Sequence, residues 1–112
     1  MKMLKDELCK EAIIMNTMTI SKVDEYIDKL QVADNTTKVE IENKLVSIGD
    51  EVVEDLVNYL QVLKGTVRGV VAMTLIRIGE PAVDYLKKAA EENKDFGWIA
   101  DYLITEINGA AA

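Results

Sequence analysis

The side chains that most enzymes use for acid–base and nucleophilic chemistry are scarce in this chain. Its 112 residues include one cysteine, Cys9, and no histidine. Histidine titrates near neutral pH and is the commonest metal ligand, so its absence removes the usual general base and the usual zinc ligand. A single cysteine also cannot form an internal disulfide. We therefore expect no enzymatic activity, no bound metal and no cofactor.

Cys9 itself has two interpretations. Its thiol could act as a nucleophile or carry a thioether-linked group. However, Cys9 shares a predicted helical face with Lys5, Ala12 and Ile13, and a free cysteine more often behaves as a small buried apolar residue. We assign it no catalytic role.

Acidic side chains recur along the chain at intervals of thirty residues. Two such series stand side by side, the second ending in a tyrosine: Asp24, Glu54 and Asp84; Glu25, Asp55 and Tyr85. Stacked in space, they would form an acidic trough that attracts a basic segment of another protein. The alternative is a solvated helix face, because acids in a first helical turn are already favoured by the helix dipole. Tyr85 would either join a contact surface or be partly buried.

The overall charge points away from nucleic acid and membranes as partners. Twenty acidic and thirteen basic residues give a net charge of −7, which disfavours approach to phosphate backbones and anionic lipid. The longest apolar runs have four residues, for example Val70 to Met73, whereas a membrane span needs about twenty. Charged residues interrupt the N-terminus where an export signal needs an apolar block. We expect a cytoplasmic protein.

Two segments thirty residues apart are nearly the same, and they predict the architecture. They are LVSIGDEVVEDL, from Leu45, and LIRIGEPAVDYL, from Leu75. Apolar residues recur at helical spacing on both sides of a glycine, Gly49 or Gly79, which can adopt the left-handed conformation that ends a helix. Pro81 suits the first turn of the helix that follows, and Asp50 takes the matching place as an N-cap. Each segment therefore predicts a helix, a break and a second helix.

The helix pattern extends to both ends of the chain, but at the last helix the offset is twenty-eight residues, which aligns Ala72 with Ala100 and Leu75 with Leu103. It predicts seven helices, at residues 3–17, 21–32, 37–48, 51–63, 67–78, 81–92 and 96–108. Short, turn-rich linkers make successive helices antiparallel neighbours. We divide residues 1–108, a single domain, into repeats at 3–32, 37–63 and 67–92 and a half repeat at 96–108, with a tail at 109–112. A hairpin of this size cannot bury its apolar face alone, so the hairpins should stack into an all-α, right-handed solenoid of about three and a half hairpins.

One unit resembles a known family. The segment VRGVVAMTLIRIGEPAVDYLKKA, from Val67 to Ala89, is similar to the HEAT-like repeats of phycobilisome lyases. The positions that carry the resemblance are Arg68, Ala72, Leu75, Ile78, Gly79, Pro81, Val83 and Leu86. The resemblance extends to residues 37–63, with Lys38 where the family has arginine. It implies a solenoid whose second helices line the concave side. It also permits a bilin lyase, or a regulatory subunit of one, with a chromophore on Cys9.

The last predicted helix carries an aromatic stripe. Its inward positions are Ile99, Leu103 and Ile107, while Trp98 and Tyr102 form a second stripe that a following hairpin would cover. These aromatics would cap the stack, dock onto a second copy of the chain, or receive a partner.

These patterns together predict a non-enzymatic scaffold or adaptor whose partner is another protein. The candidate binding residues are the acidic face, Asp24, Glu25, Glu54, Asp55, Asp84 and Tyr85, and the aromatic end, Trp98 and Tyr102.

Overall fold

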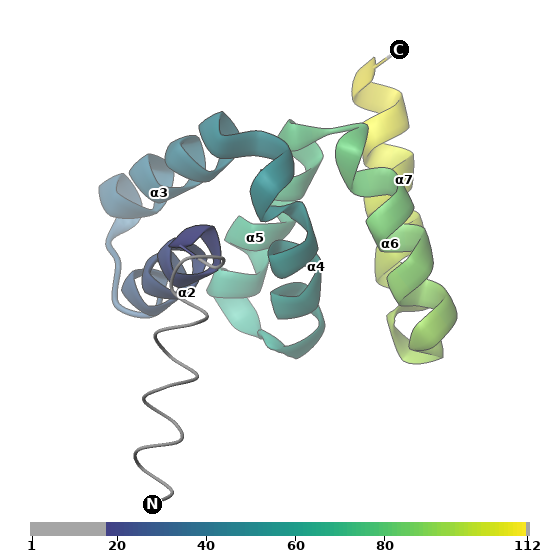
Figure 1. The fold of residues 1–112 in the computed structure, drawn as a ribbon, viewed down its shortest axis with the longest axis horizontal. Helices are drawn as coiled ribbons and strands as arrows, with labels where there is room; N and C mark the ends of the chain where they lie inside the picture. Colours follow the sequence, from purple (N-terminus) through teal and green to yellow (C-terminus); the bar gives the residue numbers. More distant parts are fainter. Residues whose placement is uncertain (1–17, 112) are drawn as a thin grey trace, which may run out of the picture.

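The computed structural model describes residues 18–111, and every regular element among them is helical (Figure 1). This confirms the predicted all-α class. The elements are α2 (Met18–Leu30), α3 (Asn35–Ile48), η1 (Gly49–Val52), α4 (Val53–Val62), α5 (Gly65–Ile78), α6 (Pro81–Glu92), η2 (Lys94–Phe96) and α7 (Gly97–Ala111). The predicted helix at 3–17, together with Cys9, lies outside the described residues.

Local sequence signals account for several helix ends. The amide of Thr37 donates a 2.8 Å hydrogen bond to Oδ1 of Asp34, which caps α3 and holds the pKa of that carboxyl below its ordinary value. Gly49 and Gly79 follow α3 and α5 with φ of 75° and 85°, and their N–H groups donate to the carbonyls of Leu45 and Leu75. Glycine adopts this positive φ without the steric cost that a Cβ would bring.

The predicted N-cap at Asp50 is wrong. Asp50 lies inside η1, a short 3-10 helix that joins α3 to α4, and α4 begins only at Val53. The backbone after Gly49 therefore turns as a tight helix before the second α-helix starts, and no side chain caps α4. In the next repeat α6 begins at Pro81, as predicted.

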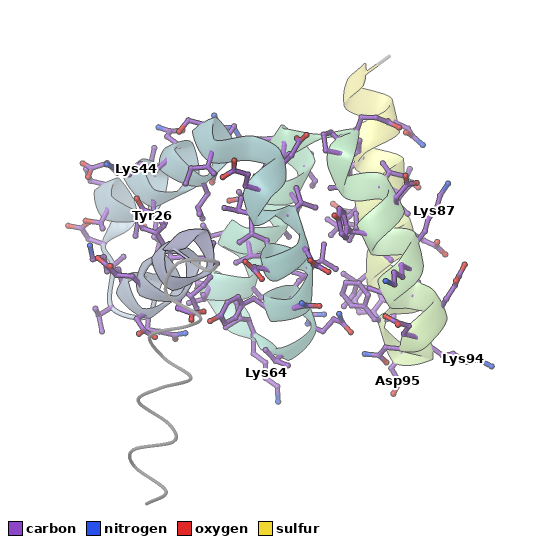
Figure 2. All side chains as sticks on the ribbon, viewed as in Figure 1. Tyr26, Lys44, Lys64, Lys87, Lys94 and Asp95 are labelled. Carbon is purple, nitrogen blue, oxygen red and sulfur yellow. The ribbon has the colours of Figure 1, made fainter. Side chains whose placement is uncertain are left out.

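The helices pack in two layers. In one, which we call the odd layer, α3 packs against α5 and α5 against α7; in the other, the even layer, α2 packs against α4 and α4 against α6. Figure 1 looks onto α4 and α6, with α5 and α7 behind them. The turns at Lys64 and at Lys94 and Asp95 lie at the same edge of the molecule (Figure 2).

The core lies between the layers and repeats with the sequence. The valines at Val23, Val53 and Val83 are all buried. The leucine pairs that are thirty residues apart are also fully buried: Leu30 and Leu60, Leu45 and Leu75, Leu56 and Leu86. Burying each such side chain contributes roughly 1.5–3 kcal/mol, so the repeated register is also the main source of stability.

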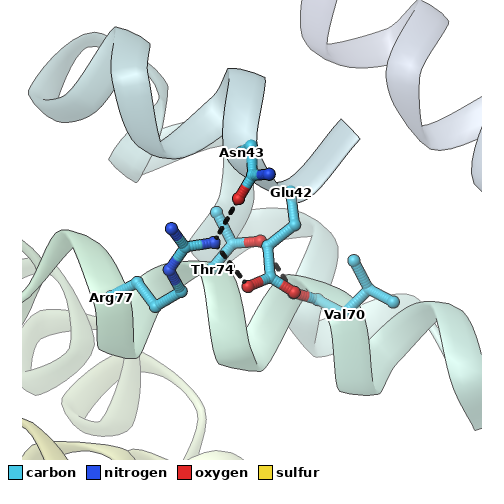
Figure 3. A network of polar contacts seen from close by, with 5 residues as sticks. All are labelled: Glu42, Asn43, Val70, Thr74 and Arg77. Carbon is cyan, nitrogen blue, oxygen red and sulfur yellow. Dashed lines mark hydrogen bonds and ion pairs between the residues drawn. The ribbon is translucent and has the colours of Figure 1, made fainter. Parts of the chain in front are cut away.

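A polar network joins α3 to α5 within the odd layer (Figure 3). Arg77 Nη1 donates to Oε2 of Glu42 at 2.7 Å and to Oδ1 of Asn43 at 2.8 Å. Nearby, the fully buried Thr74 donates its hydroxyl to the carbonyl of Val70 at 2.7 Å, which satisfies a polar group that α3 covers. The pairing of Arg77 fixes which side of α5 faces α3.

The register of α7 differs from the prediction by one residue. Its buried residues are Ala100, Leu103 and Ile107, and Phe96 of η2 is buried just before it. Leu103 and Ile107 face the core as predicted, but Ala100 takes the place of Ile99, which is only partly buried. These positions follow the buried Val67, Val71 and Thr74 and the partly buried Ile78 of α5 by twenty-nine residues, not twenty-eight. The buried Phe96 follows Leu86 by ten residues, whereas the equivalent Val67 follows Leu56 by eleven, and one residue turns a helix by about 100°.

None of the helices between residues 18 and 111 combines the length and the apolar character needed to cross a membrane.

Candidate functional site

The two layers differ sharply in charge. Counted over their residues, α2, η1 with α4, and α6 carry formal charges of −1, −4 and −1. In the odd layer α3 is neutral, α5 carries +2, and η2 with α7 carries −2. Most of the chain's net charge of −7 therefore belongs to the even layer, and the residues from Gly49 to Val62 contain no lysine or arginine.

A tyrosine connects α4, the most acidic helix of the even layer, to α2. The hydroxyl of Tyr59 in α4 donates a hydrogen bond to Oδ1 of Asp24 in α2. This bond raises the pKa of Tyr59 to about 12, with smaller contributions from burial and from the charges of Asp24, Asp28 and Asp55. Tyr59 therefore stays protonated at neutral pH and holds the Asp24 carboxylate beside α4.

Tyr59 also lines a shallow depression on the face of α4. This depression has a volume of about 200 Å³ and is lined by Asp55, Asn58, Tyr59 and Val62. Val62 is 70% exposed and adds an apolar side chain to this lining. Burial raises the pKa of Asp55, and the charges of Glu54 and Asp24 raise it further. The depression thus combines an apolar part with a carboxylate that no lysine or arginine pairs with among residues 18–111.

A second, smaller depression lies between α4 and α6. It has a volume of about 60 Å³, and its lining residues are Glu54, Val57, Asn58, Gln61, Tyr85, Lys88, Ala89 and Glu92. At its end, Nδ2 of Asn93 donates a 3.2 Å hydrogen bond to Oε1 of Gln61. Glu54 and Tyr85, from different predicted series, therefore lie at one site, and Lys88 adds a positive charge there.

The other predicted acidic residues line neither of these two depressions. Glu25 is exposed and forms a 3.1 Å ion pair with Lys29. It lines a separate cavity of about 250 Å³ between α2 and α3, whose other lining residues are Tyr26, Lys29, Thr37, Glu40, Ile41 and Lys44. Figure 2 labels Tyr26 and Lys44 at this end of the molecule. Asp84 is exposed on α6.

The aromatic pair lies on the other layer. Trp98 and Tyr102 are 71% and 59% exposed on α7, so they do not adjoin the acidic depressions on α4. The structure therefore brings Asp24, Glu54, Asp55 and Tyr85 to the face of the even layer and leaves Trp98 and Tyr102 apart from it.

Sequence reasoning missed Tyr59 and Val62. Tyr59 stands where the neighbouring repeats have Lys29 and Ala89, and Val62 stands one repeat after Val32, which is 88% exposed. An aromatic at the position that holds lysine in one neighbouring repeat and alanine in the other was an available signal. The hydrogen bond between Tyr59 and Asp24 was not predictable, because the two residues are 35 positions apart and so do not align in the thirty-residue repeat.

The chemistry of this face is electrostatic. Among the described residues, no group of three or more histidine, cysteine, aspartate or glutamate side chains is arranged to hold a metal ion. The carboxylates can attract cations and accept hydrogen bonds, and Tyr59 with Val62 offers an apolar contact. Cys9 lies outside the described residues.

Comparison of the chain with protein-family models, with curated proteins and with solved structures finds no match in any of the three.

Proposed function

We propose that the chain is a non-enzymatic protein-interaction module that binds a basic segment of another protein on the face of the even layer. The observation that carries the proposal is the character of α4. Its residues and those of η1 hold four acids and no cation, and Asp55 has a raised pKa because burial and neighbouring carboxylates disfavour its charge. A lysine or arginine from a partner would relieve that repulsion.

We further propose that the hairpins form a short, right-handed solenoid of the HEAT-like type, with the even layer on its concave side. The thirty-residue register of buried valines and leucines supports this proposal, as does the packing of each helix against the next helix of its own layer. A concave face of this kind suits an extended or helical segment laid across several repeats.

The partner segment should be amphipathic. Basic side chains would pair with Asp24, Glu54 and Asp55, while an apolar side chain would cover Val62 and the ring of Tyr59. Opposite charges across a contact raise the association rate and select the partner. Exposed charges are screened over roughly 8–10 Å at physiological salt, so binding should weaken as salt is added. The same face repels nucleic acid, whose phosphates carry the same sign.

A charge-matched pair of variants tests this proposal. The test variant combines Asp24→Asn, Glu54→Gln and Asp55→Asn on the even layer. The control combines Asp95→Asn, Asp101→Asn and Glu106→Gln on η2 and α7, which removes the same number of charges from the odd layer. Binding of a fluorescein-labelled peptide of alternating lysine and leucine is measured by anisotropy at low and at physiological salt.

We expect the test variant to bind the peptide about tenfold more weakly, because three partly exposed ion pairs of about 0.5 kcal/mol each sum to the 1.4 kcal/mol that changes affinity tenfold. The control should retain most of the affinity. Equal losses in both variants would mean that only net charge matters and that the even layer is not a site. No binding of the peptide at low salt would also refute the proposal.

A further inference from the structure

The odd layer exposes apolar side chains that the acidic face does not explain. On α3, α5 and α7 the exposed large apolar residues are Val39, Met73, Trp98 and Tyr102, whose exposed fractions are 57%, 52%, 71% and 59%. Single exposed apolar residues are ordinary on protein surfaces, but a contiguous group of them marks a contact. Whether these four form a group depends on which side of each helix they occupy.

All four residues lie on the outer side of the odd layer. Each stands two positions from a buried residue of its helix: Val39 from Ile41, Met73 from Val71, and Trp98 and Tyr102 from Ala100. Two residues turn an α-helix by about 200°. The four side chains therefore point away from the core on three adjacent helices, and we call them the outer apolar ridge.

The ridge is distinct from the end of the helix stack. In α5, Arg77 lies on the side that faces α3. The opposite side of α5 includes Ala72, the residue after the buried Val71. The equivalent side of α7 includes Asp101, the residue after Ala100, and Thr105, one turn further on. Both are exposed polar residues. Polar residues, not the aromatic pair, therefore close this end of the described layer.

Two of the helices that carry the ridge have opposite net charges. Helix α5 carries +2, from Arg68 and from Arg77, which also pairs with Glu42 of α3 and stays 41% exposed, and η2 with α7 carries −2. In a twofold-symmetric dimer every contact occurs twice: if a residue of α5 in one chain contacts a residue of α7 in the other, the same two residues also meet with the chains exchanged. A twofold axis between α5 and α7 would lay the positive helix of each chain over the negative helix of the other. Two even layers facing each other would instead repel.

We propose that the outer apolar ridge is the contact surface of a symmetric homodimer, in which Met73 of each chain packs against Trp98 and Tyr102 of the other. A methionine sulfur beside an aromatic ring is a favourable contact, and the paired α5 and α7 helices set the orientation. The acidic faces of both chains remain open on the outside of the pair.

The dimer should be weak. Four side chains supply less area than the roughly 800 Å² per partner of a standard interface, so we expect a dissociation constant in the range of about 10 μM to 1 mM. Trp98 is the only tryptophan in the chain, so its fluorescence reports directly on the ridge. Covering its exposed ring should shift the emission to shorter wavelength as the concentration rises.

The experiment measures sedimentation and Trp98 emission over a series of concentrations from about 1 μM to 1 mM. Test variants are Met73→Glu and Tyr102→Glu, which leave Trp98 in place as the probe. The control is Val62→Glu, which adds the same charge at a valine of similar exposure on the even layer. Circular dichroism verifies that each variant is folded.

The proposal requires a mass that rises from monomer to dimer in the wild type and in Val62→Glu, together with the emission shift. Met73→Glu and Tyr102→Glu should remain monomeric at the concentrations where the wild type pairs. A wild-type monomer throughout, or equal loss in Val62→Glu, would overturn it. Continued binding of the basic peptide by such a monomer would leave the even-layer proposal intact.

Discussion

Replacing Tyr59 with phenylalanine removes one hydrogen bond between α2 and α4 and leaves the ring in place. Because the hydroxyl donates to a carboxylate, the bond belongs to the stronger class, worth about 1.5–3 kcal/mol where it is buried. Asp24 is exposed, so water competes for it. We therefore expect Tyr59→Phe to lower the free energy of unfolding by about 1 kcal/mol at neutral pH.

The same bond predicts a dependence on pH. The pKa of Tyr59 rises from an ordinary value of 10.0 to about 12 in the folded chain. A group whose folded pKa is raised binds its proton more tightly in the native state, so its contribution to stability is complete below pH 10 and is lost as the pH rises through 12. The stability difference between wild type and Tyr59→Phe should therefore shrink across this interval.

Urea unfolding of both proteins at neutral and alkaline pH measures the difference. Tyr85→Phe is the matched control, because the hydroxyl of Tyr85 makes no hydrogen bond within the described residues and its loss should change stability by less than about 0.5 kcal/mol. A double-mutant cycle with Asp24→Ala should give a coupling of about 1 kcal/mol. A coupling near zero, or a difference that stays constant from neutral pH to pH 12, would refute the role assigned to Tyr59.

Three further changes have expected outcomes that urea unfolding can measure. Asp55→Asn should stabilise the chain at neutral pH by a few tenths of a kcal/mol, because the raised pKa means that the ionised carboxylate is disfavoured in the folded state, and the gain should vanish as the pH falls below about 4. Gly79→Ala should destabilise by about 1–2 kcal/mol because its φ is 85°. Gly69→Ala, inside α5 with open space around a new Cβ, should instead stabilise by about 0.5–1 kcal/mol. If both glycine substitutions change stability in the same direction, the backbone assignment is wrong. Arg77→Ala should cost about 1 kcal/mol by removing the bonds to Glu42 and Asn43, and Arg77→Lys should recover only part of it; an equal loss in both variants would contradict this account of the network.

The helices were predictable because their signals are local. Gly49, Gly79 and Pro81 mark the ends and starts of helices at fixed places in the repeat, and the buried valines and leucines follow helical spacing. The register of α7 was not predictable to one residue, because it depends on how many residues the connection through η2 takes up. A one-residue change there moves Ile99 partly out of the core.

The candidate site was predictable only in part. Asp24, Glu54, Asp55 and Tyr85 stood out because they repeat. Tyr59 did not, because its contact with Asp24 crosses between helices and breaks the period. The contrast in charge between the layers was also hidden, since it appears only once the helices are sorted into the layer to which each belongs.

That contrast gives the molecule a permanent electric dipole whose negative end is the even layer. In the field of a cationic partner such a dipole experiences a torque, which acts within roughly a Debye length of contact. The chain would therefore rotate before contact, so that α4 faces the partner. Productive collisions should therefore be more frequent than random orientation allows, and the excess should disappear when added salt shortens the reach of the field.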